Sequence, residues 1–243
     1  MEYVFESGDP EYQENRRMAM FQGFSDETNE FLWGIRLNNS REWFQPRKQI
    51  YVDKVYTPLK DLAWEVQDRM TALYPEEPFF CKVTRIYKDA RMPQKDGPYK
   101  THLWFSIRPP QDPEVQSVVP DLFFDLLGGG WSVGLDYYCT RPAVMAYFRQ
   151  KALEDPKPLE ELTLLLQERP EFQLRGEEYK KSKGDVGPLL QPWFNKKRFY
   201  IMDSHDWESE ILCSPELADR ITETFQWLMP VYRYFNVPAS ELP

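Results

Sequence analysis

The first clear pattern along the chain is helical, and it begins at Ser25. Apolar residues then recur at helical spacing: Phe31, Leu32 and Ile35. The hydroxyl of Ser25 can cap the free amides at the start of a helix, and the acidic residues that follow suit the positive end of the helix dipole. The polar pair Asn38-Asn39 ends the pattern, so we predict a helix over residues 25–37.

A second helical pattern starts at Ser40 and runs much further. After Pro46, one apolar stripe is kept by a series of residues: Val55, Leu59, Leu62, Ala63, Val66 and Met70. Pro58 lies inside this stripe, where a proline removes a backbone donor and crowds the preceding turn. We therefore expect either one kinked long helix or two helices that meet at residues 57–58.

The middle of the chain changes to a strand pattern. Residues 79–87 and 100–107 are rich in β-branched and aromatic side chains and flank a loop of Asp, Pro, Gly and Lys, which predicts antiparallel pairing. Residues 122–127 and 131–139 flank Gly128-Gly129-Gly130, where glycine permits the positive φ angles of a tight turn. This second pair is the clearest hairpin signal.

The last third returns to helices separated by short strands. Thr140 can cap a helix that ends near Glu154, and Pro158 opens another. Residues 172–175 and 198–202 are short strand candidates. Ser214-Pro215-Glu216 is a strong start for a long final helix, because proline is favoured at the first helical position.

Together these elements predict an α+β fold. We expect amino-terminal helices, a central, largely antiparallel sheet built from hairpins, and a long carboxy-terminal helix packed on that sheet. Residues 1–20 are acidic and lack sustained periodicity, so we predict a flexible acidic tail followed by one α+β domain over residues 21–243.

Composition narrows the classes of function. The 243 residues carry a formal net charge of -9, which argues against nucleic acid as a partner because duplex binding depends on Lys and Arg neutralising phosphates. There is no apolar run long enough for a membrane span and no signal-peptide pattern, so we expect a cytoplasmic protein without a membrane partner. The three cysteines show no metal-binding spacing, so we expect no metal site, and the sequence identifies no cofactor.

One segment departs from the acidic character of the chain. Residues 81–108 hold seven Lys and Arg against two Asp, a local balance of +5. An Arg fork, lysine ammonium groups and a tyrosine hydroxyl on one loop suit a phosphate or carboxylate group. The candidate ligand-binding residues are Arg85, Arg91, Lys95, Tyr99 and Lys100. The alternative is a plain hairpin connection in which Asp89 pairs with Arg85 or Arg91 and fixes the turn.

A second basic stretch runs from Arg175 to Arg198. Lys180 and Lys181 are its candidate contribution, as a secondary basic rim to the first site. If both stretches line one cleft, they make a focused positive site. The alternative is a solvated loop rim, since charge runs usually face water.

Two residues are candidates for proton transfer. His102 falls in a predicted strand beside the basic loop, and Asp89 lies within the loop, so each is a candidate general acid or base. His205 has the sequence context of a turn residue. The chain has no HExxH spacing, no GxSxG elbow for a catalytic triad, and no GK[ST] after the glycine run to make a phosphate loop.

Ordered motifs in these segments are similar to those of one known family. They are Gly23-Phe24 before Thr28 and Phe31-Leu32, Asn38-Asn39 with Arg41-Glu42-Trp43-Phe44, and Arg85-Ile86 followed by Asp89, Arg91, Lys95 and Pro98-Tyr99-Lys100. Tyr179-Lys180-Lys181-Ser182 adds a later match. The chain resembles domain of unknown function (DUF) family 2461. The resemblance implies an α+β domain with no assigned activity, and it groups residues 38–44 with residues 89–100 as paired features.

Two functions remain open at this point. The first is an uncharacterised protein that binds a small anionic ligand, carrying phosphate or carboxylate, at the basic hairpin loop, with or without catalysis. The second is a non-enzymatic interaction module whose aromatic and acidic surface recruits a protein partner. The sequence does not decide whether the protein is an enzyme.

Overall fold

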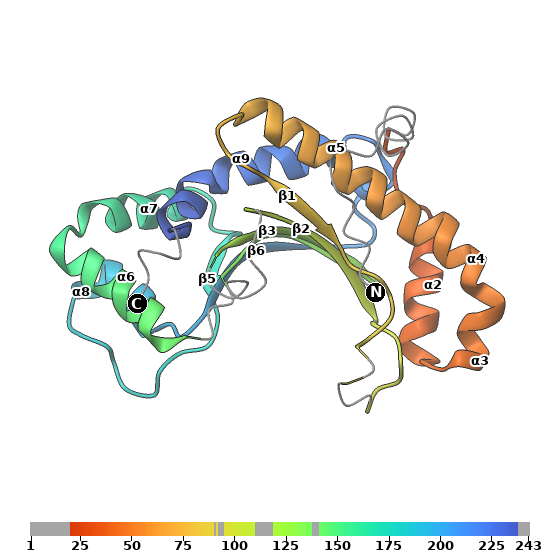
Figure 1. The fold of residues 1–243 in the computed structure, drawn as a ribbon, viewed down its shortest axis with the longest axis horizontal. Coiled ribbons are helices and arrows are strands. Elements are labelled where there is room, and N and C mark those ends of the chain that lie inside the picture. Colours follow the sequence, from red (N-terminus) through yellow and green to blue (C-terminus); the bar gives the residue numbers. More distant parts are fainter. Residues whose placement is uncertain (1–19, 90, 92–94, 110–118, 138–140, 238–243) are drawn as a thin grey trace.

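The computed structural model describes residues 20–89, 91, 95–109, 119–137 and 141–237 (Figure 1). Its centre is a six-stranded antiparallel sheet with the strand order β1-β2-β3-β4-β6-β5. The strands are β1 (Phe80–Val83), β2 (His102–Arg108), β3 (Asp121–Leu127), β4 (Gly130–Tyr137), β5 (Gln173–Arg175) and β6 (Phe199–Asp206). Strands β1 to β4 therefore follow one another in the sheet in the same order as along the chain.

Both predicted hairpins are confirmed. Strand β1 pairs with β2, from Phe80 opposite Arg108 to Val83 opposite Phe105. Strand β3 pairs with β4 up to Leu127 opposite Gly130, so the turn holds only two residues, 128–129. Gly129 has a φ of +94°, and a side chain there would also collide with the Trp33 ring of the first helix. The glycine run therefore serves a tight turn under a helix.

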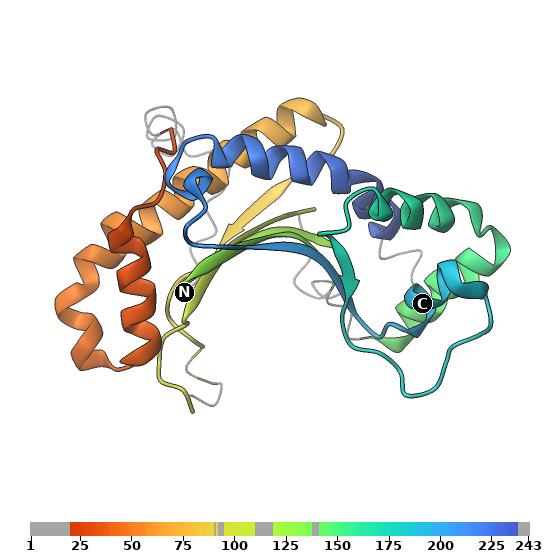
Figure 2. The ribbon, with the colours of Figure 1, turned by 180° about the vertical axis from the view of Figure 1, so that it is seen from behind.

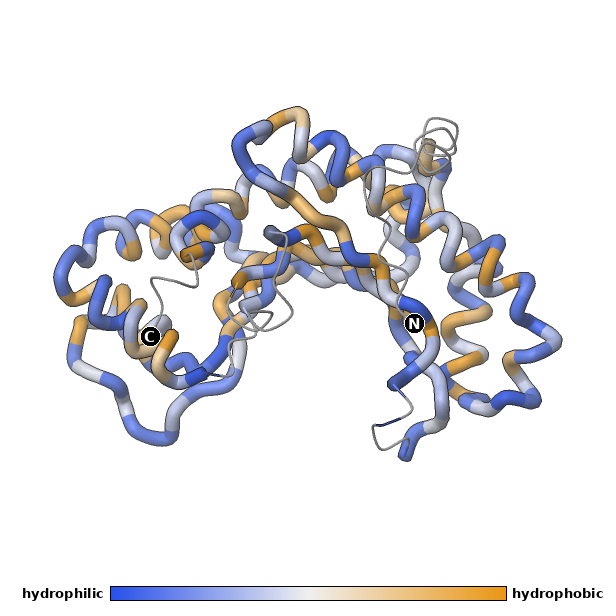
Figure 3. Tube along the Cα trace, viewed as in Figure 1, coloured by the Kyte–Doolittle hydropathy of each residue, from blue (hydrophilic) through white to orange (hydrophobic). Residues whose placement is uncertain are grey.

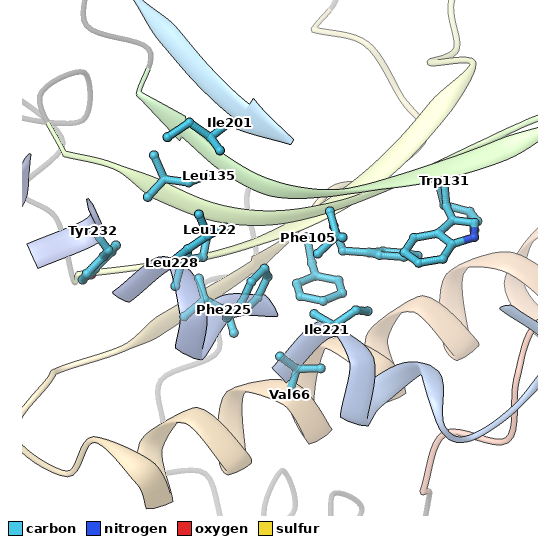
Figure 4. Packing of buried hydrophobic residues seen from close by; sticks show 14 of the residues in the cluster. Val66, Phe105, Leu122, Trp131, Leu135, Ile201, Ile221, Phe225, Leu228 and Tyr232 are labelled. Atoms are coloured by element: carbon cyan, nitrogen blue, oxygen red, sulfur yellow. The ribbon is translucent and has the colours of Figure 1, made fainter. Parts of the chain in front are cut away.

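The core lies between the sheet and two long helices. Along β3, buried residues alternate with partly exposed ones, as expected of a strand with one covered face. The covered face meets α5 (Thr57–Leu73) and α9 (Leu217–Phe235). Figure 4 shows this packing, in which Phe105, Leu122 and Leu135 of the sheet point toward Val66 of α5 and Phe225 of α9. The predicted long final helix on the sheet is confirmed.

The amino-terminal helices follow the predicted boundaries closely. They are α2 (Asp26–Leu37), α3 (Arg41–Phe44), η1 (Gln45–Arg47), α4 (Lys48–Ile50), η2 (Tyr51–Tyr56) and then α5. Ser25 is the N-cap of α2, and its backbone N–H donates to the Thr28 hydroxyl at 3.2 Å. Ser40 is the N-cap of α3 and accepts from the Trp43 amide at 3.2 Å.

Pro58 is accommodated without a break between helices. The turns before it, Tyr51–Tyr56, are a π-helix, in which Thr57 N–H donates to the carbonyl of Val52. Because Pro58 has no N–H, the carbonyl of Lys54 loses its usual partner. The hydroxyl of Thr28 on α2 donates to that carbonyl at 2.6 Å and replaces the missing bond. Of the two predicted outcomes, the continuous helical run is the one observed.

The other end of the molecule holds α6 (Pro142–Glu154), α7 (Lys157–Gln167) and α8 (Gly187–Asn195), with η3 (Glu210–Cys213) leading into α9. The predicted cap Thr140 lies outside the described residues, and α6 begins at Pro142. Helix α8 was not predicted from the sequence. It is short and contains Pro192, and only Leu190, Trp193 and Phe194 mark its buried face. Two or three apolar residues among prolines give too weak a periodic signal.

The sheet is strongly arched. In Figures 1 and 2, α5 and α9 lie over its convex face, helices α2 to α4 stand at one end, and helices α6 to α8 stand at the other. No described helix lies on the concave face between the two ends. Figure 3 shows that the described loops at both ends of the arch are mostly hydrophilic.

The predicted α+β class is confirmed. Most of the predicted tail, residues 1–19, lies outside the described residues, and the single-domain boundary stays a prediction. Within the described part of the chain, no helix combines the length and apolar character needed to cross a membrane.

Candidate functional site

The basic hairpin loop is anchored to the amino-terminal helices. The carboxamide of Asn39, which follows α2, donates to the carbonyl of Tyr99 at 2.9 Å and accepts from its N–H at 3.0 Å. Gly97 has a φ of +86° and leaves no room for a side chain against Asn39. The Tyr99 ring packs on Phe44 with centroids 4.4 Å apart. The two motif segments grouped by the family resemblance are therefore in direct contact.

This contact changes the interpretation of Tyr99. Its side chain is buried, and burial raises the pKa of its phenol above the usual range. The ring stabilises the loop as part of the core between Phe44 and Tyr87. The side chain predicted as a ligand donor thus has a packing role in the structure.

Asp89 and Arg91 form a pair on the outside of the loop. The Arg91 Nη2 atom donates to Asp89 Oδ2 at 2.6 Å, and the side chain of Arg91 is 89% exposed. Hydrogen bonds from Arg91 lower the pKa of Asp89 to about 2. A carboxyl group that stays ionised and paired is poorly suited to proton transfer near neutral pH. The alternative prediction, a pair that fixes the turn, describes this contact.

Lys100 connects the loop to the sheet. Its ammonium group donates to the carbonyl of Arg85 at 2.9 Å and lies 4.9 Å from the centre of the Trp104 ring. Arg85 and Lys95 are exposed on the same loop. Since Trp104 lies on β2, this contact places the charge of Lys100 at the edge of the concave face.

His102 continues the same series of contacts. Its ring stacks on Trp104 with centroids 5.0 Å apart, and its Nδ1 atom lies 2.8 Å from Asp125 Oδ1. The side chain of His102 is 47% exposed and that of Asp125 is 24% exposed. Within the described part of the chain, the Nε2 atom of His102 has no hydrogen-bond partner. Asp125 was not among the predicted residues, although it interrupts the apolar β3 pattern at the position expected for the open face.

These contacts define a concave cluster of four residues. Lys100 and His102 were predicted from the sequence, and Trp104 and Asp125 were not. Residues 102 and 104 alternate with the covered residues of β2, and Asp125 is directly opposite Trp104 in the register with β3. The alternation of strand side chains therefore places these three on the concave face.

Further along the concave face lies a second group of charges. Asp121 of β3 is opposite Asp136 of β4, and Arg108 lies 3.7 Å from Asp121. Burial raises the pKa of both carboxyl groups, each to about 6, although Arg108 and Arg198 oppose this effect. The sequence pattern gives no sign of this group, because only the sheet register brings residues 121 and 136 together.

The second basic stretch lies at the opposite edge of the sheet. The hairpin loop connects β1 and β2, whereas residues 176–198 connect β5 and β6. The hairpin loop leads into β2 at the strand ends that carry His102 and Asp206, whereas the second stretch joins β5 and β6 at the strand ends that carry Arg175 and Phe199. The stretches therefore lie at opposite ends of the arch (Figure 1). Lys180 and Lys181 are exposed there. The two stretches do not line one cleft, so Lys180 and Lys181 are no rim to the hairpin site.

The sequence context of His205 predicts a turn residue, and this prediction is wrong. It lies in β6 opposite Trp131, and the two rings stack with centroids 4.1 Å apart. Its Nε2 atom is 2.8 Å from Asp203 Oδ2, without the alignment of a hydrogen bond. Strand β6 extends beyond the predicted residues 198–202 because its pairing with β4 continues to Asp206.

Among the described residues, no three His, Cys, Asp or Glu side chains are grouped as a metal site.

Comparison with known proteins identifies the family of the chain. No curated protein matches the chain. The family model described as conserved hypothetical protein (DUF2461) matches residues 27–234, and the chain therefore belongs to this family.

Proposed function

We propose that the protein binds a small anionic ligand, carrying phosphate or carboxylate, where the hairpin loop meets the concave face. The observation that carries this proposal is the unbroken series of contacts from Lys100 through Trp104 and His102 to Asp125. It joins a positive charge, an aromatic surface and a titratable pair within one small area. These are the components that small-molecule sites combine.

The charge of the loop favours an anion. Lys100 is fixed by the carbonyl of Arg85 and by the face of Trp104, so its ammonium group loses little freedom when a ligand binds. Lys88 and Lys95 add to the positive field of the same loop, within a chain of net charge -9. A local positive field in an acidic protein directs small anions to this point.

The pair of His102 and Asp125 supports proton transfer to or from the ligand. A carboxylate at Nδ1 favours the tautomer that carries its proton on that nitrogen, which leaves Nε2 as a base. The half-exposed ring can reach a ligand on the concave face, and histidine exchanges protons near neutral pH. In this proposal His102 acts as the general base and Asp125 orients it.

A ligand screen with paired variants tests the proposal. Metabolites bearing phosphate or carboxylate groups are added to the full chain, and the melting temperature is followed. A ligand at about 100 times its Kd stabilises the folded state by about 2.7 kcal/mol. We expect Lys100→Ala and His102→Gln to reduce this shift strongly, because they remove the charge and the proton acceptor.

Lys60 provides a matched control. Its ammonium group lies 4.5 Å from the ring of Trp64 on α5, in the same sequence spacing as Lys100 and Trp104. Lys60→Ala should keep the full ligand shift. Equal shifts in the Lys100 and Lys60 variants would contradict the proposed site. A chain that responds to no ligand would instead favour the protein-interaction function.

A further inference from the structure

A second cationic cluster surrounds the ring of Tyr179 at the other end of the arch. The ammonium group of Lys183 lies 4.5 Å from the centre of this ring, the guanidinium of Arg149 lies 5.1 Å away, and the ammonium of Lys197 lies 5.7 Å away. The three cations come from helix α6, from the loop before α8 and from the segment before β6. We call these four residues the Tyr179 cluster.

The backbone holds the Tyr179 cluster in place. Residues 177–179 pair with residues 195–197, through the Tyr179 N–H bond to the carbonyl of Asn195 at 2.8 Å and the bridge between Glu178 and Lys196. Arg149 donates from Nε to the carbonyl of Phe194 and from Nη2 to that of Lys196, both at 2.8 Å. The guanidinium is therefore fixed in position by the segment that it approaches.

The loop that carries Lys183 is also ordered by its own polar contacts. Gln191 of α8 donates to the Ser182 hydroxyl at 2.9 Å and to Asn195 Oδ1 at 3.0 Å. Ser182 in turn donates to the carbonyl of Gly184 at 2.9 Å. Lys183 thus extends from a defined turn, and its position over Tyr179 is a feature of the fold.

Acidic partners neutralise only part of this positive charge. Lys197 pairs with Glu177 at 2.5 Å, and Lys196 pairs with Glu178 at 2.6 Å. Within the described part of the chain, four other basic residues of this region have no ion-pair partner: Arg149, Lys180, Lys181 and Lys183. Cations held around one ring repel each other, and an anion bound beside them would relieve that repulsion.

We propose that the Tyr179 cluster binds the phosphate group of a small molecule, at a site separate from the concave cluster. A phosphate group offers several acceptor oxygens and two negative charges, which suit a fixed guanidinium together with several ammonium groups. The net charge of -9 works against long nucleic acids, whose binding depends on many phosphate contacts. A small phosphate-bearing molecule can bind at the Tyr179 cluster without contacting the acidic parts of the surface.

Calorimetric titration of the full chain with inorganic phosphate, and in parallel with adenosine monophosphate, tests this site. We expect Lys183→Ala to weaken binding by about tenfold or more, because it removes the ammonium group nearest the ring. Binding of both probes assigns the phosphate group itself, and binding of the monoester alone assigns phosphate esters. Arg149 is left unchanged because its guanidinium also anchors two backbone carbonyls.

Lys151→Ala is the matched control. Lys151 lies on α6, the helix that carries Arg149, and its ammonium group is 4.8 Å from the ring of a different tyrosine, Tyr234. This variant should bind phosphate as the parent does. Equal weakening in both variants, or no binding of either probe up to about 10 mM, overturns the proposal. Loss in Lys100→Ala with retention in Lys183→Ala also overturns it, and assigns the anion to the hairpin site instead. A thermal melt of each variant confirms that it is folded.

Discussion

The only two histidines of the chain each lie beside an aspartate and a tryptophan, yet on opposite faces of one sheet. His102 stacks on Trp104 on the concave face and contacts Asp125 of the neighbouring strand. His205 stacks on Trp131 on the covered face and contacts Asp203 two positions earlier on its own strand. The same three residue types thus occur in two different surroundings.

The difference lies in what covers each pair. Trp131 is 1% exposed under the helices, and Arg220 at the start of α9 approaches Asp203 at 3.9 Å. The side chain of His102 is 47% exposed and that of His205 is 29% exposed. Similar contacts therefore lie within the packed core on one face and leave a half-exposed imidazole ring on the other. Residue composition alone does not separate these two roles.

The largest expected effect comes from the two tryptophans. Trp131→Ala should destabilise the fold by about 3–5 kcal/mol, because it leaves a cavity in the core between sheet and helices. Trp104→Ala should cost only about 1 kcal/mol, since the ring is half-buried on the concave face. Urea unfolding of both variants measures the difference. Similar losses in the two variants would show that the concave face is packed as tightly as the covered one.

The loss of stability on substitution should differ less between the two histidines than between the two tryptophans. His205→Ala should cost about 1–2 kcal/mol, because the ring fills space against Trp131 beside Asp203. His102→Ala should cost less than about 0.5 kcal/mol, as polar contacts between partly exposed side chains contribute little. The same unfolding experiment serves, at a pH where each variant unfolds reversibly. A larger loss at position 102 than at position 205 would refute the assignment of a structural role to His205.

The last expected effect is one of pH, and it concerns the carboxyl groups of the concave face. Burial raises the pKa of Asp121 and Asp136 to about 6, so each carboxyl group keeps its proton to a higher pH in the folded protein than in the unfolded chain. Their stabilising contribution is full below the ordinary pKa near 3.8 and is lost as the pH rises through about 6. After allowance for solvent screening, we expect the parent to lose on the order of 1 kcal/mol between pH 5 and pH 8 from this source.

The double variant Asp121→Asn with Asp136→Asn isolates this contribution, because asparagine does not titrate. Its overall stability changes as Arg108 and Arg198 lose their counter-charges. The informative quantity is therefore the slope of the unfolding free energy with pH, which should be flatter than in the parent. An unchanged slope would mean that neither carboxyl group has a raised pKa.

Much of the architecture follows from local sequence signals. Ser25, Ser40 and the glycine turn mark element boundaries through chemistry that acts within a few residues, and the structure has each of them in that place. Helix α8 and the full length of β6 escaped prediction for the opposite reason. Leu190 and Trp193 give little periodicity, and the end of β6 is set by its partner β4, which lies far away in the chain.

The candidate site was predictable only in part. Lys100 and His102 stand out because they lie beside a loop of unusual charge. Asp125 could not be assigned to His102 from the sequence, since that contact depends on the register between β2 and β3. Tyr99 and Asp89 match the family motif, but their contacts with Phe44 and Arg91 fix the loop. A motif does not distinguish residues that build a site from residues that act in it.

The strand order also has a consequence for how the molecule folds. Strands β1 to β4 form successive hairpins, whereas β6 must return to β4 after the chain has built α6, α7 and α8. Closing a long loop costs more entropy than closing a short one, so nearby strands tend to pair first. We expect strands β1 to β4, which include His102, to acquire structure early. Strand β6 with His205, and the connection that carries Tyr179, would then form last, when β6 pairs with β4.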